Sequence, residues 1–198
     1  TALGAAQLNA SANVPGSFSY NPAAGTVLDA GSRTLTANFT PIDAVNYSSA
    51  SATVTLNVTK ATPSITWANP ADITYGTPLG AAQLNASANV PGSFAYGPAS
   101  GIVLNAGSHT LTANFTPNDA ANYNSASATA TLTVAKATPA ITWANPADIT
   151  YGTALGAAQL NASANVPGSF TYNPAAGTVL DAGSRTLTAN FTPNDAEN

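Results

Sequence analysis

The sequence predicts an all-β fold built from tandem two-sheet sandwiches, and three observations support this prediction. Nearly identical segments recur at a step of 76 residues, from Thr1 to Thr77 and from Thr77 to Thr153. Apolar residues alternate with Ser and Thr along several segments, which is the pattern of a half-buried strand. Runs rich in Gly, Pro, Asn and Asp separate these segments, and no segment has a helical period.

The 76-residue step predicts one complete repeat flanked by two incomplete ones. Residues 61–136 form the complete repeat, residues 1–60 lack its first strands, and residues 137–198 lack its last strand. The chain holds two steps of 76 residues plus 46 more, which is not a whole number of repeats. We therefore expect the sequence to be a window on a longer periodic chain.

Strands follow from the alternating segments of the complete repeat. The clearest is "SASATATLTV" at 125–134, in which Ala, Leu and Val occupy one parity and Ser and Thr the other. Strands are expected near 63–68, 72–76, 82–88, 93–97, 101–104, 109–116 and 125–135. Side chains expected to face a thin, Ala-rich core are Ile65, Trp67, Tyr75, Leu84, Phe94, Val103, Leu111, Phe115, Leu132 and Val134. Because Trp143 is expected to face the core, Trp143→Ala should lower the free energy of unfolding by about 3 to 5 kcal/mol.

Composition excludes several classes of function. The chain has no cysteine, so neither a disulfide nor a thiolate metal site stabilises it. Its 4 basic and 8 acidic residues give a net charge of −4, which argues against a nucleic-acid partner. No apolar run is long enough to insert into a bilayer, and no signal peptide is visible.

No residue is assigned a catalytic, cofactor-binding or metal-binding role. His109 is the sole histidine, and Arg33 and Arg185 take its place in the other copies, so a solvated residue at a strand start is the favoured interpretation. Without Cys or a second His, neither a nucleophile–His pair nor a zinc cluster can form.

Calcium is the one ligand hypothesis that the acidic residues leave open. Single carboxylates recur in the turns, but without the clustered spacing of strong sites, so turn capping is favoured over metal binding. These carboxylates belong to Asp43, Asp72, Asp119, Asp148 and Asp195. Asp29 and Asp181 are replaced by Asn105 in the middle copy, which also fits a turn residue.

Other polar patterns have both a functional and an ordinary interpretation. Eight Asn-x-Ser/Thr glycosylation sequons occur, at Asn9, Asn38, Asn46, Asn57, Asn85, Asn114, Asn161 and Asn190. Chance and repetition explain them in a chain this rich in Asn, Ser and Thr. The outward-facing rows of Thr could bind ice or sugar, but Thr is also common in strands that bind nothing, because it has a high strand propensity.

Two pentapeptides, "DAANY" at 119–123 and "DAVNY" at 43–47, match the pattern of a tyrosine corner in immunoglobulin-like sandwiches. In such a corner the tyrosine hydroxyl bonds back to the backbone. No Cys follows two residues later and only one further strand does, so the motif could also be an analogue of that corner.

The whole chain resembles the bacterial immunoglobulin-like repeats of the Big group. The resemblance rests on "ATPxITWANPADITYGT", "GTVLDAGSRTLTANFTPxD" and the closing "ATLTV". It implies an antiparallel immunoglobulin-like β-sandwich used as a spacer, stalk or adhesive module in secreted or surface-anchored bacterial proteins. It supplies no catalytic residues.

The segment between repeats, "VAKATPAIT", contains a proline and no glycine. Such a linker is short and stiff, so we expect an extended rod whose repeats touch mainly their neighbours. The expected function is a structural stalk or filament at the bacterial cell surface, with neighbouring repeats, and identical chains in a fibre, as partners. The alternative is an adhesive array that binds carbohydrate, ice or a partner protein.

Overall fold

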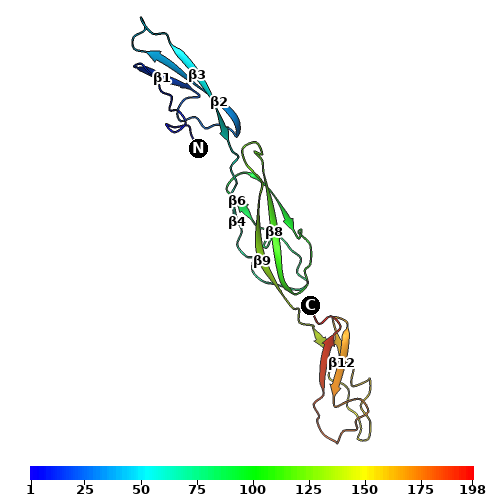
Figure 1. Cartoon of the computed structure of the whole chain (residues 1–198). Coiled ribbons are helices and arrows are strands. Elements are labelled where there is room, and N and C mark those ends of the chain that lie inside the picture. Colours follow the sequence, from blue (N-terminus) through cyan, green and yellow to red (C-terminus); the bar gives the residue numbers. More distant parts are fainter. The chain divides into compact units, whose positions relative to one another are not determined.

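The computed structural model describes residues 1–198, and the chain is all-β, with thirteen strands and no helix (Figure 1). No segment therefore forms a helix long and apolar enough to cross a bilayer. The chain divides into two compact units. The first unit consists of Thr1–Ala68, Asn85–Gly97 and Thr112–Thr129. The second unit consists of Asn69–Leu84, Pro98–Leu111 and Ala130–Asn198. Below, residues 1–60, 61–136 and 137–198 are called the first, middle and third copies, and their identity as separate domains stays a prediction.

The first unit contains a three-stranded antiparallel sheet of order β1-β2-β3. Its strands are β1 (Gly16–Asn21), β2 (Gly31–Pro41) and β3 (Ala50–Val58). The short strands β4 (Ile65–Thr66) and β6 (Ser87–Ala88) pair antiparallel, and β7 (Gly92–Gly97) pairs with the second half of β8 (Gly107–Pro117).

The second unit contains the short strand β5 (Ile73–Thr74), which runs parallel to the end of β9 (Ala126–Ala135). The strand order β5-β9-β8-β7 places β9 between two neighbours. The remaining strands form two-stranded antiparallel sheets, β10 (Ile141–Thr142) with β11 (Ser163–Ala164), and β12 (Gly168–Asn173) with β13 (Thr188–Pro193).

One hairpin depends on a glycine that admits an aromatic ring. In the β7–β8 pair, Phe94 lies opposite Phe115, with ring centroids 4.9 Å apart. A Cβ atom at Gly92 would overlap the Phe115 ring, so only glycine leaves room for it. The same close approach joins Gly16 to Phe39 and Gly168 to Phe191.

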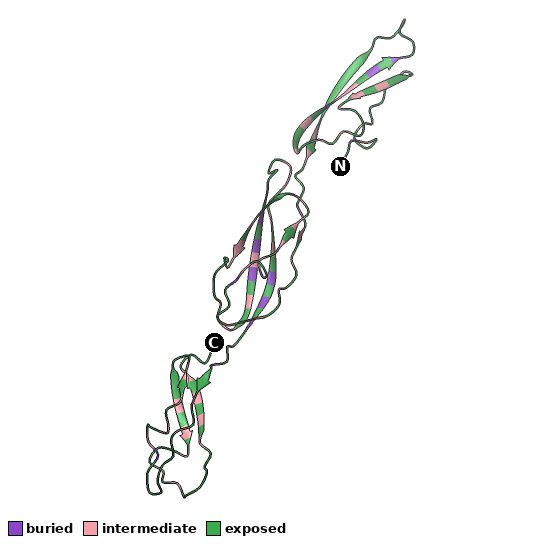
Figure 2. Ribbon diagram, turned by 180° about the vertical axis from the view of Figure 1, so that it is seen from behind, coloured by how far each residue is buried: buried purple, intermediate pink, exposed green.

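Burial confirms the predicted period of β8 and β9. Leu111, Phe115, Leu132 and Val134 are buried, whereas the Ser and Thr residues between the apolar positions of β9 are exposed. Figure 2 shows buried residues concentrated in β8 and β9, while β12 and β13 carry only half-buried and exposed residues. The predicted all-β class is therefore correct, and several sheets with one buried face are compatible with a sandwich.

Two predicted strands are wrong. Residues 82–86 do not continue a strand, because the Gln83 side-chain Oε1 accepts the Gly80 N–H at 3.1 Å and closes a turn. Only Ser87–Ala88 of that range is strand. Residues 101–104 form a single bridge, between Val103 and Pro78, and the Val103 side chain, predicted to face the core, is 47% exposed.

The remaining members of the predicted inward set, namely Ile65, Trp67, Tyr75, Leu84 and Phe94, are half-buried. The core also contains Leu79, 2% exposed, which the alternation did not single out. Leu79 lies in a connection between strands, where no two-residue period marks it.

The predicted tyrosine corner is not formed at its predicted place. The Tyr47 and Tyr123 hydroxyls make no hydrogen bond, and their backbone N–H groups bond to the carbonyls of Asp43 and Asp119. A tyrosine hydroxyl does bond to the backbone elsewhere, where Tyr20 accepts the Ala10 N–H at 3.0 Å and Tyr172 accepts the Ala162 N–H at 3.1 Å.

Candidate functional site

His109 has a structural partner at the start of β8. Its Nε2 donates to the Asn105 carbonyl at 2.7 Å. Arg33 Nε donates to the Asp29 carbonyl at 2.9 Å, so arginine in the first copy makes the equivalent contact. His109 therefore holds a turn closed, as the arginine does.

The aspartates of the "TPxDA" turns cap their own turns. Asp119 Oδ1 accepts the Asn122 N–H at 3.1 Å and its Oδ2 accepts the Asn122 side-chain amide at 2.8 Å. Asp43 and Asp195 make the same contacts with Asn46 and Asn198. Asp72 and Asp148 are exposed without a side-chain hydrogen bond, and no three His, Cys, Asp or Glu side chains gather where a metal ion could be held.

The same turn joins the first and middle copies within the first unit. While Asp119 holds the Asn122 side-chain amide, Asn122 Oδ1 accepts the Ala30 N–H at 2.7 Å. Asn122 Nδ2 also donates to Asp29 Oδ1 at 3.2 Å, and Lys60 Nζ donates to the Ala120 carbonyl at 2.6 Å. One asparagine therefore links its own turn to a turn of the preceding copy.

An equivalent joint lies within the second unit. Asn198 Oδ1 accepts the Ala106 N–H at 2.7 Å, and Asp195 Oδ2 accepts the Asn198 side-chain amide at 2.9 Å. Lys136 Nζ donates to the Ala196 carbonyl. Both asparagine contacts join residues 92 positions apart, so equivalent positions of the repeat meet at the two joints.

These side-chain bonds lower the pKa of the capping carboxylates. Hydrogen bonding from the Asn122 side chain is the main cause for Asp119, and Lys60 adds an attractive charge. The pKa of Asp195 falls below its ordinary value for the same reasons, with Asn198 and Lys136 as partners. The ionised carboxylate is therefore the form that the joint favours.

Lowering the pH is expected to weaken both joints. Because the folded-state pKa of Asp119 is depressed below 3.8, its contribution is complete above 3.8 and is lost as pH falls through the lowered value. NMR titration of the Asn122 and Asn198 side-chain amide signals should show midpoints below 3.8. Asp119→Asn should abolish the Asn122 transition alone, and a midpoint at or above 3.8 would contradict the assignment.

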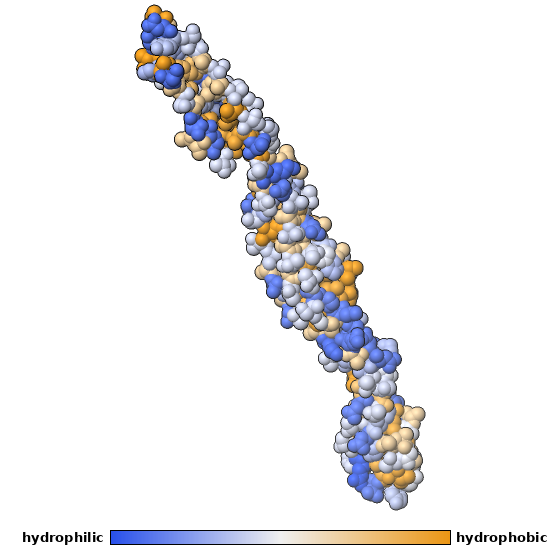
Figure 3. Space-filling view, in the orientation of Figure 1, coloured by the Kyte–Doolittle hydropathy of each residue, from blue (hydrophilic) through white to orange (hydrophobic).

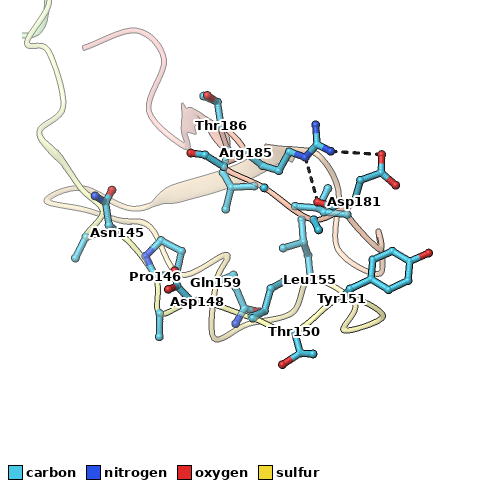
Figure 4. Close-up of a pocket in the computed structure, with 18 of the residues that line it drawn as sticks. Asn145, Pro146, Asp148, Thr150, Tyr151, Leu155, Gln159, Asp181, Arg185 and Thr186 are labelled. Atoms are coloured by element: carbon cyan, nitrogen blue, oxygen red, sulfur yellow. Dashed lines mark hydrogen bonds and ion pairs between the residues drawn. The ribbon is translucent and has the colours of Figure 1, made fainter.

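The third copy contains an open groove of about 840 Å³ (Figure 4). Asn145 to Tyr151 follow one side and Asp181 to Thr186 the other, with Leu155 and Gln159 between them. An ion pair between Arg185 and Asp181 at 3.4 Å lies on one rim. Asp148, Asp181 and Arg185 are the charged residues that line the groove, and the other lining residues are uncharged.

Charged residues make up only 6% of the chain. In the view of Figure 3 apolar colour appears as separate patches among residues of intermediate hydropathy. All eight sequon asparagines are exposed. The sequence did not single out the joint asparagines or the groove, although Asn122 lies in the pentapeptide read as a tyrosine corner.

Comparison of the chain with protein-family models, with curated proteins and with solved structures gave no match. The function is therefore argued from the residues of this chain.

Proposed function

We propose that this chain is a structural spacer, a segment of a stalk or filament built from tandem immunoglobulin-like sandwiches in a long extracellular bacterial repeat protein. The observation that supports it is the recurring joint, in which Asn122 and Asn198 contact the preceding copy with the same register. Polar side-chain contacts at equivalent positions thus connect successive copies.

A spacer has to resist bending between its repeats, and the side-chain hydrogen bonds of the joint oppose such bending. The Asn122 side chain uses its oxygen and its amide at the same time, because Asp119 fixes the amide while Ala30 donates to the oxygen. Within the middle copy, the Ala61 N–H donates to the Asn122 carbonyl at 2.9 Å and the Asn124 N–H donates to the Ala61 carbonyl at 2.8 Å, which fixes the end of the linker to the same turn. A short linker carrying a proline needs few such bonds to keep one orientation.

Asn122→Ala is expected to loosen the joint while leaving the folding of each copy unchanged, because Asn122 is not a core residue. The chain has no cysteine, so spin labels on introduced cysteines at Thr53 and Ser127, both exposed, report the joint specifically. The distance distribution between these labels should broaden in Asn122→Ala. Asn118→Ala, in the same turn, is the matched control because its side chain makes no hydrogen bond, and equal broadening in both variants would contradict the spacer mechanism.

The adhesive alternative is tested with the full chain on a glycan array and in ice-recrystallisation assays. A spacer should give no saturable binding in either assay. Reproducible binding with a micromolar Kd, lost when the exposed Thr129, Thr131 and Thr133 are replaced by Val, would contradict the pure spacer role.

A further inference from the structure

The N–H group at the centre of each joint belongs to a peptide group whose carbonyl is also bound. In the joint of Asn122, called the first joint below, the Ala30 N–H donates to Asn122 Oδ1 at 2.7 Å. The carbonyl of the same peptide group, that of Asp29, accepts a hydrogen bond from Arg33 Nε at 2.9 Å. A donor on its carbonyl polarises a peptide group and strengthens the N–H as a donor. Arg33 therefore acts on the first joint through the peptide group between Asp29 and Ala30.

Arg33 also holds this turn at a second point. Its Nη2 donates to the Ala30 carbonyl at 3.0 Å, so one guanidinium binds two successive carbonyls. A guanidinium can do this because it is planar, permanently charged and carries five donors. The ion pair between Arg33 and the Asp29 carboxylate, at 3.7 Å, is exposed and adds little by itself. The hydrogen bonds to the two carbonyls are therefore the main contribution of Arg33.

The Asp29 carboxylate adds a second hydrogen bond across the first joint. Its Oδ1 accepts from Asn122 Nδ2 at 3.2 Å, while Asn122 Oδ1 accepts the Ala30 N–H. The Asn122 side chain thus binds successive residues of the preceding copy through both ends of its amide. Two such bonds fix the orientation of the amide better than one bond does.

The middle copy replaces both residues of this pair, with Asn105 for the aspartate and His109 for the arginine. In the joint of Asn198, called the second joint below, the central bonds remain. His109 Nε2 donates to the Asn105 carbonyl at 2.7 Å, and the Ala106 N–H donates to Asn198 Oδ1 at 2.7 Å. The Asn105 side chain makes no hydrogen bond with Asn198, and His109 makes none with the Ala106 carbonyl. The replaced pair therefore removes both additional bonds and keeps the central ones.

We propose that this residue pair sets how firmly one copy is joined to the next. Asp29 with Arg33 makes a stiff joint, and Asn105 with His109 makes a more compliant one. Arg33 is a positioning residue, because it acts on Asn122 through the Ala30 peptide group. The proposal rests on the spacer role and extends it, since an array can then vary in stiffness from joint to joint while the asparagine turn stays the same.

The double variant Asp29→Asn with Arg33→His, made in the full chain, gives the first joint the residue pair of the second. Both new residues occur at the equivalent positions of the middle copy, so the turn is expected to fold. The protection factor of the Ala30 amide in hydrogen exchange should fall about three- to tenfold, as for the loss of one net hydrogen bond. The distance distribution between spin labels at Thr53 and Ser127 should broaden.

The reciprocal double variant, Asn105→Asp with His109→Arg, should raise the protection factor of the Ala106 amide by a similar factor. Each comparison is made within one joint, so other differences between the joints, such as Glu197 in place of Ala121, do not affect it. Unchanged protection of the joint amide in both double variants would overturn the proposal.

Arg33→His alone separates the positioning role from simple closure of the turn. A histidine still reaches the carbonyl that Arg33 Nε binds, as His109 shows, but it gives up the bond to the Ala30 carbonyl. If Arg33 only closed its turn, this variant would keep the protection of the Ala30 amide. We expect a partial loss, smaller than in the double variant.

The failure of this proposal can be distinguished from the failure of the spacer role. If Asn122→Ala broadens the label distances but the Asp29→Asn, Arg33→His variant keeps full protection of the Ala30 amide, the spacer role stands and the residue pair does not set the joint. If the double variant lowers that protection while the label distances stay narrow in both variants, the residue pair does set the joint and the spacer mechanism is contradicted.

Discussion

Phe115→Ala is expected to lower the free energy of unfolding of the middle copy by about 3 to 5 kcal/mol. Phe115 is 1% exposed and is the largest fully buried side chain of the protein. Its ring packs against Phe94 and over the backbone of Gly92, so truncation leaves a cavity that neither residue can fill. The loss includes both the apolar area and the cavity.

Hydrogen exchange of β7 and β8, measured with denaturant, gives this loss for the middle copy by itself. Phe191→Ala is the matched control in the third copy. Phe191 also packs against a phenylalanine, Phe170, with ring centroids 4.8 Å apart, but Phe191 is only half-buried. Phe191→Ala should lower the free energy of unfolding of the third copy by clearly less than Phe115→Ala lowers that of the middle copy. Equal losses would mean that the burial of Phe115 does not set its contribution.

The strands that sequence alone predicts well are those with one face packed in the core and the other face exposed to solvent. In β9 the exposed Thr129 and Thr131 alternate with the buried Ala130 and Leu132, so the two-residue period reports burial directly. The same reasoning works for β8. The third copy shows the limit of this reasoning, since "GSRTL" at 183–187 has nearly the same sequence as the start of β8 but forms no strand.

The parts that were not predicted depend on side chains bonding to backbone. Gln83 closes the Gly80 turn through its Oε1, which overrides the apparent alternation of 82–88. The motif "GAAQ" recurs in all three copies, and a Gln three residues after a Gly was the available signal. The joints were harder, because Asn122 meets Ala30 across 92 residues and no local pattern identifies the partner.

Leu111→Ala in the middle copy and Leu187→Ala in the third copy are expected to differ strongly, although both leucines lie in the sequence Thr-Leu-Thr-Ala-Asn-Phe. Leu111 is 0% exposed, so its truncation should cost about 2 to 5 kcal/mol. Leu187 lines the open groove and is half-buried, so the second variant should cost clearly less. The unfolding of each copy can be followed by the fluorescence of its own tryptophan, Trp67 or Trp143, with the other replaced by Phe. Equal costs would show that the difference in burial between these two leucines does not set their contributions to stability.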